Sequence, residues 1–242
     1  MLAGIVAGIV VAGPAEAGSG KAVARGFYAT VFGGEDRQNA AAGGFVKKFT
    51  RPVRYHLVST SRVDRRPSAR DYLASLSGAV VNLDLLETGR AASADLIIYL
   101  TDRADYVATI RATAWEGVAT GFLEANACST VLAARRGGIE RAMVYLVADE
   151  GFAAFAHCLV EEVAQSLGPA NDDPALAGSI FNDRSRVVGL GELDWLILNV
   201  LYDARILPGM DARQVGEVLP QVIADTQRRL GGMPPALVRS LP

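Results

Sequence analysis

Residues 157–173, HCLVEEVAQSLGPANDD, combine two helical stripes and a helix stop in one short segment. Four polar side chains recur at i, i+3, i+4 and i+7, so they share one face of a helix. They are Cys158, Glu161, Glu162 and Gln165. The apolar positions 160, 163, 164 and 167 form the neighbouring face. Gly168 can end the helix in a left-handed conformation and Pro169 prevents its continuation, so the segment predicts an amphipathic helix followed by a tight turn.

On either side of this segment, strands and helices alternate first and helices then follow alone. A segment of alternating character after Pro52 predicts an edge strand at 53–58, and a short apolar run rich in strand formers predicts a central strand at 94–100. Residues 128–134 and 139–147 predict a β-hairpin around the turn at 135–138. Helical spacing extends the helix described above to 152–167 and indicates further helices at 21–32, 67–86, 103–115, 192–202 and 211–230. This order predicts an α+β fold in which helices pack on one mixed sheet, within a single domain of residues 18–242 that has a helical C-terminal part.

The first 17 residues form an apolar run that ends in Ala15-Glu16-Ala17, the pattern of a signal-peptidase site. A positively charged leader is missing, and a buried N-terminal helix is the alternative. The run is too short to span a bilayer, so we expect no stable membrane anchor. We therefore expect residues 1–17 to be a signal peptide and the protein to be exported, either periplasmic or secreted.

Export changes what the two cysteines, Cys128 and Cys158, are expected to do. An oxidising compartment lets them form a disulfide, whereas a reducing one would leave two buried free thiols. We expect the disulfide, which would tie the predicted helix to the hairpin. The chain also carries a formal net charge of −2 with the two signs nearly balanced, so nothing in its charge favours nucleic acid as a partner.

The helix and turn resemble the pattern HExxHxxGxxHD of the metzincin zinc peptidases. Laid on that pattern, Glu162 takes the position of the general base and Asp172 follows the third ligand. The three ligand positions hold Glu161, Gln165 and Asn171. Phe181 replaces the methionine in a segment similar to the turn beneath the zinc. The resemblance implies a metzincin-like or zincin-like domain whose zinc site is degenerate.

A closer resemblance is to the bacterial family DUF2927, exported proteins with the segment Cys-x-x-Glu-Glu-x-x-Gln-x-Leu-Gly-x-x-Asn-Asp. Residues 158–172 hold this segment here. The likeness extends to six more segments, which are 30–33, 47–54, 94–106, 179–183, 201–205 and 208–210. It covers most of the chain after residue 17 and implies an exported protein of unknown function.

The residues of the degenerate site limit its metal chemistry. The chain has only two histidines, so a three-histidine zinc site is impossible, and the amides of Gln165 and Asn171 are weak ligands. We expect no metal or other cofactor, with zinc bound weakly. The oxygen ligands of the segment suit a hard cation such as calcium better, although a solvated acidic turn is the alternative. His157 lies one helical turn before Glu161, and these two side chains could also share a metal.

The resemblance to a peptidase cleft that has lost its ligands implies a pseudoenzyme of the cell envelope, non-catalytic or cryptically active, that binds a peptide or protein. The alternative is an unusual metal-dependent hydrolase of the peptidase type with Glu162 as general base. A third hypothesis is a purely structural role, so whether the protein is an enzyme stays open. In each case we expect Asn171 and Asp172 to fold back toward Glu161 and Gln165.

Overall fold

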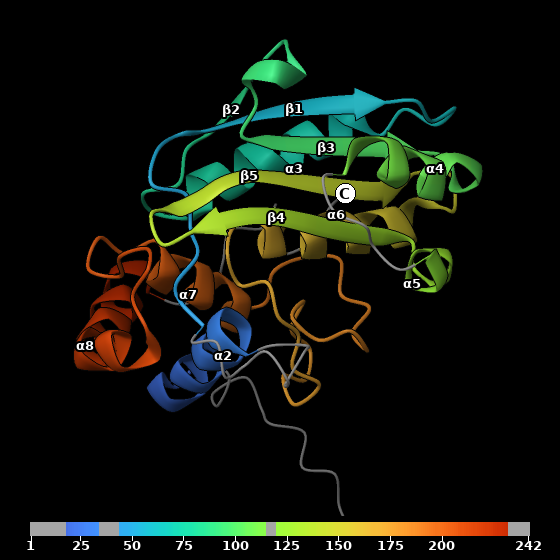
Figure 1. Cartoon of the computed structure of the whole chain (residues 1–242). Helices are drawn as coiled ribbons and strands as arrows, with labels where there is room; N and C mark the ends of the chain where they lie inside the picture. The colour runs from blue at the N-terminus through green and yellow to red at the C-terminus, as the bar shows by residue number, and fades with distance from the viewer. Residues whose placement is uncertain (1–17, 34–43, 115–119, 232–242) are drawn as a thin grey trace, which may run out of the picture.

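The computed structural model describes residues 18–33, 44–114 and 120–231, and one five-stranded sheet organises them (Figure 1). The strand order is β2-β1-β3-β5-β4. Neighbours are parallel except β4, which runs antiparallel to β5 at one edge. The strands are β1 (Val53–Ser59), β2 (Leu85–Glu87), β3 (Leu96–Thr101), β4 (Cys128–Arg135) and β5 (Gly138–Val147). This arrangement confirms the predicted α+β fold with a mixed sheet, including the hairpin.

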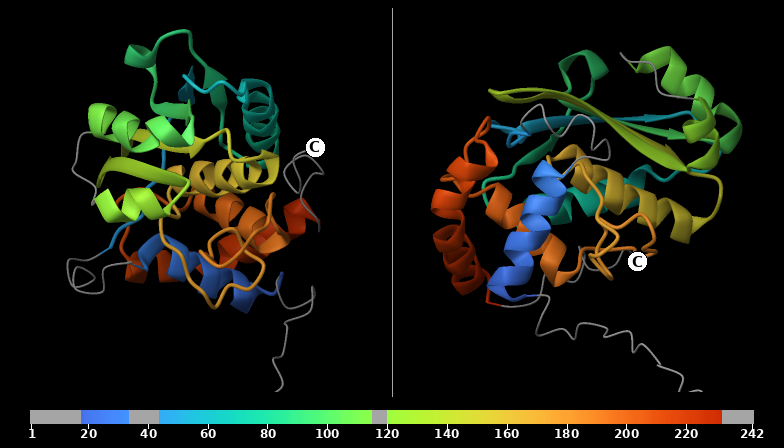
Figure 2. Two further views of the ribbon diagram at one scale, coloured as in Figure 1. Left: turned by 90° about the vertical axis from the view of Figure 1, so that its right-hand side faces the viewer. Right: turned by 60° about the horizontal axis from the view of Figure 1, so that its bottom comes forward.

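Helices pack on both faces of the sheet and continue beyond it at the C-terminal end of the chain (Figures 1 and 2). They are α2 (Gly20–Phe32), α3 (Arg66–Ala79), α4 (Arg103–Thr113), α5 (Thr120–Ala125), α6 (Phe152–Ser166), α7 (Glu192–Leu201) and α8 (Ala212–Leu230). Among the described residues, no helix has the length and apolar character needed to cross a membrane. The predicted signal peptide, residues 1–17, lies outside the described part of the chain.

Successive side chains of β5 point to opposite faces of the sheet, so this one strand contributes to two hydrophobic cores. Val144 and Leu146 face the main core, which also contains buried side chains of α3, α6, α2, α7 and α8. Tyr145 and Val147 face a smaller core that α4 and α5 cover with residues such as Tyr106. Because successive side chains of a strand point to opposite faces, a continuously apolar strand is expected where both faces are covered.

Two predictions at the other edge of the sheet are wrong. The helix predicted to run to residue 86 ends at Ala79, and Asn82 then adopts a positive φ of 61° that reverses the chain into β2. Asparagine tolerates this conformation better than most residues, so the apolar spacing beyond it does not continue a helix. As a result β1 is not an edge strand, since it pairs with β2 on one side and β3 on the other.

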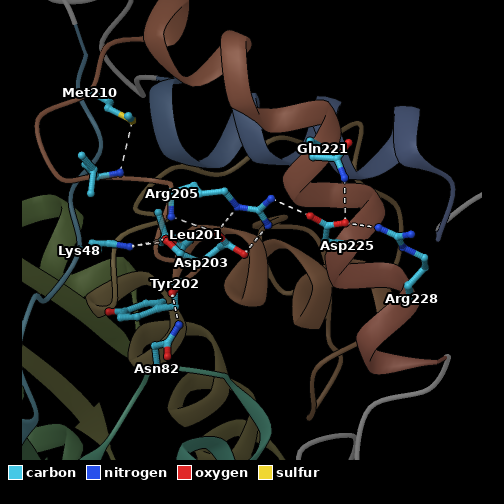
Figure 3. A network of polar contacts seen from close by, with 11 residues as sticks. Lys48, Asn82, Leu201, Tyr202, Asp203, Arg205, Met210, Gln221, Asp225 and Arg228 are labelled. Carbon is cyan, nitrogen blue, oxygen red and sulfur yellow. Dashed lines mark hydrogen bonds and ion pairs between the residues drawn. The ribbon is translucent and has the colours of Figure 1, made fainter.

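A polar network fixes the end of α7 against the segment before β1 (Figure 3). The Lys48 ammonium donates to the carbonyl oxygens of Leu201, at 2.9 Å, and Asp203, at 3.1 Å. Arg205 donates to the Asp203 carboxylate at 2.8 Å and to Asp225 of α8 at 2.6 Å. Burial lowers the pKa of Lys48 to about 8. The network joins α7, α8 and the segment before β1 that contains Lys48.

Candidate binding pocket beside helix α6

A pocket of about 760 Å³ lies between the start of β4, the polar face of α6 and the loop that returns after α6. Its volume is in the range of ordinary ligand sites. Charged and amide side chains share its wall with small apolar residues. The charged and amide side chains include Glu161, Glu162, Gln165, Asp172, Asp183 and Arg186. The structure therefore brings four of the five predicted cleft residues to one pocket.

The disulfide predicted between Cys128 and Cys158 is present and joins two walls of this pocket. Its α-carbons lie 5.7 Å apart, within the range that a disulfide spans. Next to it, the Thr130 hydroxyl of β4 donates to the carbonyl oxygen of Glu162 at 3.0 Å. The edge strand and helix α6 are thus connected by a covalent bond and a hydrogen bond.

The turn after α6 requires the glycine that the sequence places there. Gly168 has a φ of +135°, and a β-carbon on it would lie 2.1 Å from the carbonyl oxygen of Lys47. Both the backbone conformation and the close approach exclude a side chain. The chain then returns, and the Gln165 amide donates to both carboxylate oxygens of Asp172 at 3.0 and 3.2 Å. The expected meeting of Gln165 with Asp172 is confirmed.

Asn171 does not join them, so the expectation that all four side chains meet in the cleft is wrong. Its side-chain amide donates to the carbonyl oxygen of Thr30 at 2.8 Å, and its backbone N–H reaches the same oxygen at 3.2 Å. Thr30 lies in the last turn of α2, where carbonyl groups lack a partner within the helix. Asn171 therefore completes the end of α2 instead of facing Glu161.

Glu161 and His157 form a close pair on the pocket side of α6. The His157 Nε2 lies 3.3 Å from a Glu161 carboxyl oxygen, and its Nδ1 lies 2.8 Å from the carbonyl oxygen of Val187. Because a carbonyl only accepts, Nδ1 carries a hydrogen and Nε2 faces the carboxyl. Burial, and then the negative charge of Asp172, raises the pKa of Glu161 to about 8, while Arg186 acts in the opposite direction. A proton on the Glu161 carboxyl therefore removes its repulsion with the Asp172 carboxylate.

The loop beneath the pocket is held by a buried carboxylate that sequence reasoning missed. Asp194, in the first turn of α7, accepts from the hydroxyl of Ser179 and from the N–H groups of Gly191, at 2.9 Å, and Ile180, at 3.3 Å. Phe181, expected in place of a methionine, is fully buried in the same loop. The signal for Asp194 was its position three residues after Gly191, where an acidic side chain completes a helix cap. Asp183 and Arg186 were also missed, since no periodicity positions residues on an irregular loop.

The donor atoms of this pocket make a poor metal site while the disulfide is closed. Within the described residues, the metal-binding atoms that come within 4.8 Å of one another belong to Cys128, Glu161 and Glu162. The Cys128 sulfur is bonded to Cys158, which leaves two carboxylates. Gln165 is engaged with Asp172 and Asn171 with Thr30. Weak binding of zinc stays a prediction that follows from these donors.

Comparison with known proteins agrees with the resemblance seen in the sequence. The model of a family described as "Protein of unknown function (DUF2927)" matches residues 20–221. This span reaches from the first turn of α2 into α8 and contains every residue of the pocket. No curated protein matches the chain.

Proposed function

The chain belongs to DUF2927, a family of proteins of unknown function, and we propose that its pocket binds an extended segment of polypeptide without cleaving it, in the cell envelope. The observation that carries the proposal is the place of β4. It is the last strand in the sheet order and borders the pocket with Cys128, Ser129 and Thr130. An edge strand offers backbone N–H and C=O groups to which a peptide can add as a further strand.

The charge of the pocket selects the kind of side chain that the peptide inserts. Four carboxyl groups line it, those of Glu161, Glu162, Asp172 and Asp183, against the guanidinium groups of Arg103 and Arg186 and the imidazole of His157. Arg103 is already paired with Glu150 at 2.7 Å, outside the pocket lining. The acidic wall favours a basic residue, and the planar guanidinium of arginine suits paired carboxylates best.

Two features support binding without hydrolysis. In the metzincin resemblance, the three ligand positions hold a carboxylate and two amides, and neither amide is a strong zinc ligand. Asn171, at the third of these positions, contacts α2. The cell-envelope location rests on the disulfide, which fits an oxidising compartment.

The test is a soluble library of acetylated, amidated hexapeptides, with binding measured by fluorescence anisotropy. We expect a preference for arginine or lysine at one position, and at least tenfold weaker binding when N-methyl groups block alternate peptide N–H groups. Asp172→Asn and Asp183→Asn should each weaken binding of the basic peptide. The exposed Glu217→Gln on α8 is the matched control and should leave it unchanged.

Two outcomes would contradict the proposal. Equal binding of N-methylated and unmodified peptides would remove the role of the edge strand. Cleavage of the library by the purified protein, abolished in Glu162→Ala, would instead support the alternative of a hydrolase that uses Glu162 as general base.

A further inference from the structure

We propose that reduction of the Cys128–Cys158 disulfide converts this pocket into a zinc site whose ligands are Cys128, Glu161 and Glu162. One donor atom of each residue already lies within 4.8 Å of the other two. Zinc with bonds of about 2.0 Å to oxygen and 2.3 Å to sulfur holds its ligand atoms about 3.5 Å apart. Side-chain rotation of roughly 1 Å therefore brings the three donors to binding distance, with a fourth position left for water.

The closed disulfide prevents zinc binding, because only a thiolate is a strong sulfur ligand for zinc. A dithiol reductant transfers two electrons and two protons to the S–S bond, which gives two thiols and an oxidised reductant. Zinc binding then releases the protons of the Cys128 thiol and of the Glu161 carboxyl to solvent. The oxidised and reduced proteins thus differ by one soft ligand in an otherwise unchanged set of donors.

Both cysteines lie in regular elements, so opening the bond leaves the Cys128 sulfur near the carboxylates. Cys128 lies opposite Leu146 in the antiparallel pairing of β4 with β5, and the Thr130 bond to α6 remains. Cys158 belongs to the turn of α6 before Glu161 and Glu162. Separation of strand and helix is therefore resisted by contacts other than the disulfide.

One of the three proposed ligands, Glu161, already has the outer contact that a metal ligand needs. The His157 Nδ1 donates to the carbonyl oxygen of Val187, and its Nε2 faces the Glu161 carboxyl. Carboxylates that bind metals in proteins are themselves held by outer contacts of this kind. Such a histidine fixes the Glu161 carboxyl toward the pocket. The zinc proposal does not depend on peptide binding, because it concerns the reduced protein and is tested without a peptide.

The experiment compares two variants that lose the same disulfide. Cys158→Ser leaves Cys128 as a free thiol without any reductant, whereas Cys128→Ser removes the proposed ligand. Zinc affinity is measured by competition with a chromophoric chelator, and cobalt(II) serves as a spectroscopic probe. We expect Cys158→Ser to bind one zinc at least tenfold tighter than both the oxidised wild type and Cys128→Ser. Cobalt should give a thiolate charge-transfer band in Cys158→Ser alone, and adding Glu161→Gln should weaken its zinc binding at least tenfold.

Equal zinc affinity of the two single variants would overturn the proposal, and so would a Cys158→Ser protein that binds no tighter than the oxidised wild type. If either variant fails to fold, wild-type protein reduced with a phosphine replaces it. Zinc should then slow alkylation of Cys128 by iodoacetamide at least tenfold while Cys158 reacts at its unchanged rate. Equal rates at Cys128 with and without zinc would likewise overturn the proposal.

Discussion

Replacing Gly168 by alanine tests the turn that ends α6 and brings Asp172 back to the pocket. At its φ of +135°, a residue with a β-carbon is strained by about 1–3 kcal/mol. The new β-carbon would also lie 2.1 Å from the Lys47 carbonyl oxygen and 3.0 Å from a Leu201 methyl group, so backbone must shift. Such overpacking costs a further 1–3 kcal/mol or so. We therefore expect Gly168→Ala to lower the free energy of unfolding by about 3–5 kcal/mol.

Urea denaturation followed by circular dichroism, with the disulfide intact, measures this loss. For a slope near 2 kcal/mol per molar urea, the midpoint should fall by roughly 2 M. Gly178→Ala is the matched control, since Gly178 has a φ of +74° but no atom lies within 4 Å of the place that a β-carbon would take there. Gly178→Ala should lower the free energy of unfolding by only about 1 kcal/mol. If the two variants were destabilised equally, the close approach of Lys47 to the turn would be refuted.

Three further outcomes are expected. Reducing the disulfide, which spans 30 positions of sequence, should lower the free energy of unfolding by about 3–4 kcal/mol, measured by denaturation with and without reductant. Lys48→Met should cost about 2–3 kcal/mol, because it leaves two buried carbonyl oxygens without their donor. Burial lowers the pKa of Lys48 from 10.5 to about 8, so between these two pH values the unfolded chain binds more protons than the folded protein. The free energy of unfolding of the wild type should therefore increase as the pH rises from about 8 to 10.5, and that of Lys48→Met should not. In the oxidised protein, the triple variant Glu161→His, Gln165→His, Asp172→His should bind zinc, as measured by calorimetry. The triple variant with Asn171→His in place of Asp172→His should not, because Asn171 contacts α2.

The parts of the fold that follow from local pattern could be predicted from the sequence. The hairpin of β4 and β5 follows from two apolar runs around a Gly pair, and α6 from its two stripes and its glycine stop. The disulfide also follows, once export is expected from the first 17 residues. For the hairpin and for α6, the deciding residues are neighbours in the sequence, and the two cysteines are 30 positions apart.

The parts that failed depend on contacts between distant segments or on one unusual backbone angle. Asn171 is drawn to Thr30, 141 positions earlier in the chain, and no spacing rule includes such a partner. Helix α3 was predicted too long because apolar spacing continues past Asn82, where the backbone turns to a positive φ. Asp183 and Arg186 reach the pocket from an irregular loop that Asp194 holds in place, and only tertiary structure brings them there.

For the peptide complex proposed above, the covalent link between β4 and α6 determines which of the two partners loses conformational entropy on binding. Two walls that are joined by a disulfide and by the Thr130 hydrogen bond have little freedom left to lose when a ligand arrives. The ordering cost then falls on the incoming chain, at about 0.5–1.5 kcal/mol for each side chain that becomes immobile. Cyclic or proline-stiffened peptides, already extended in solution, should therefore gain more affinity here than at an adaptable surface, and the gain should appear as slower dissociation.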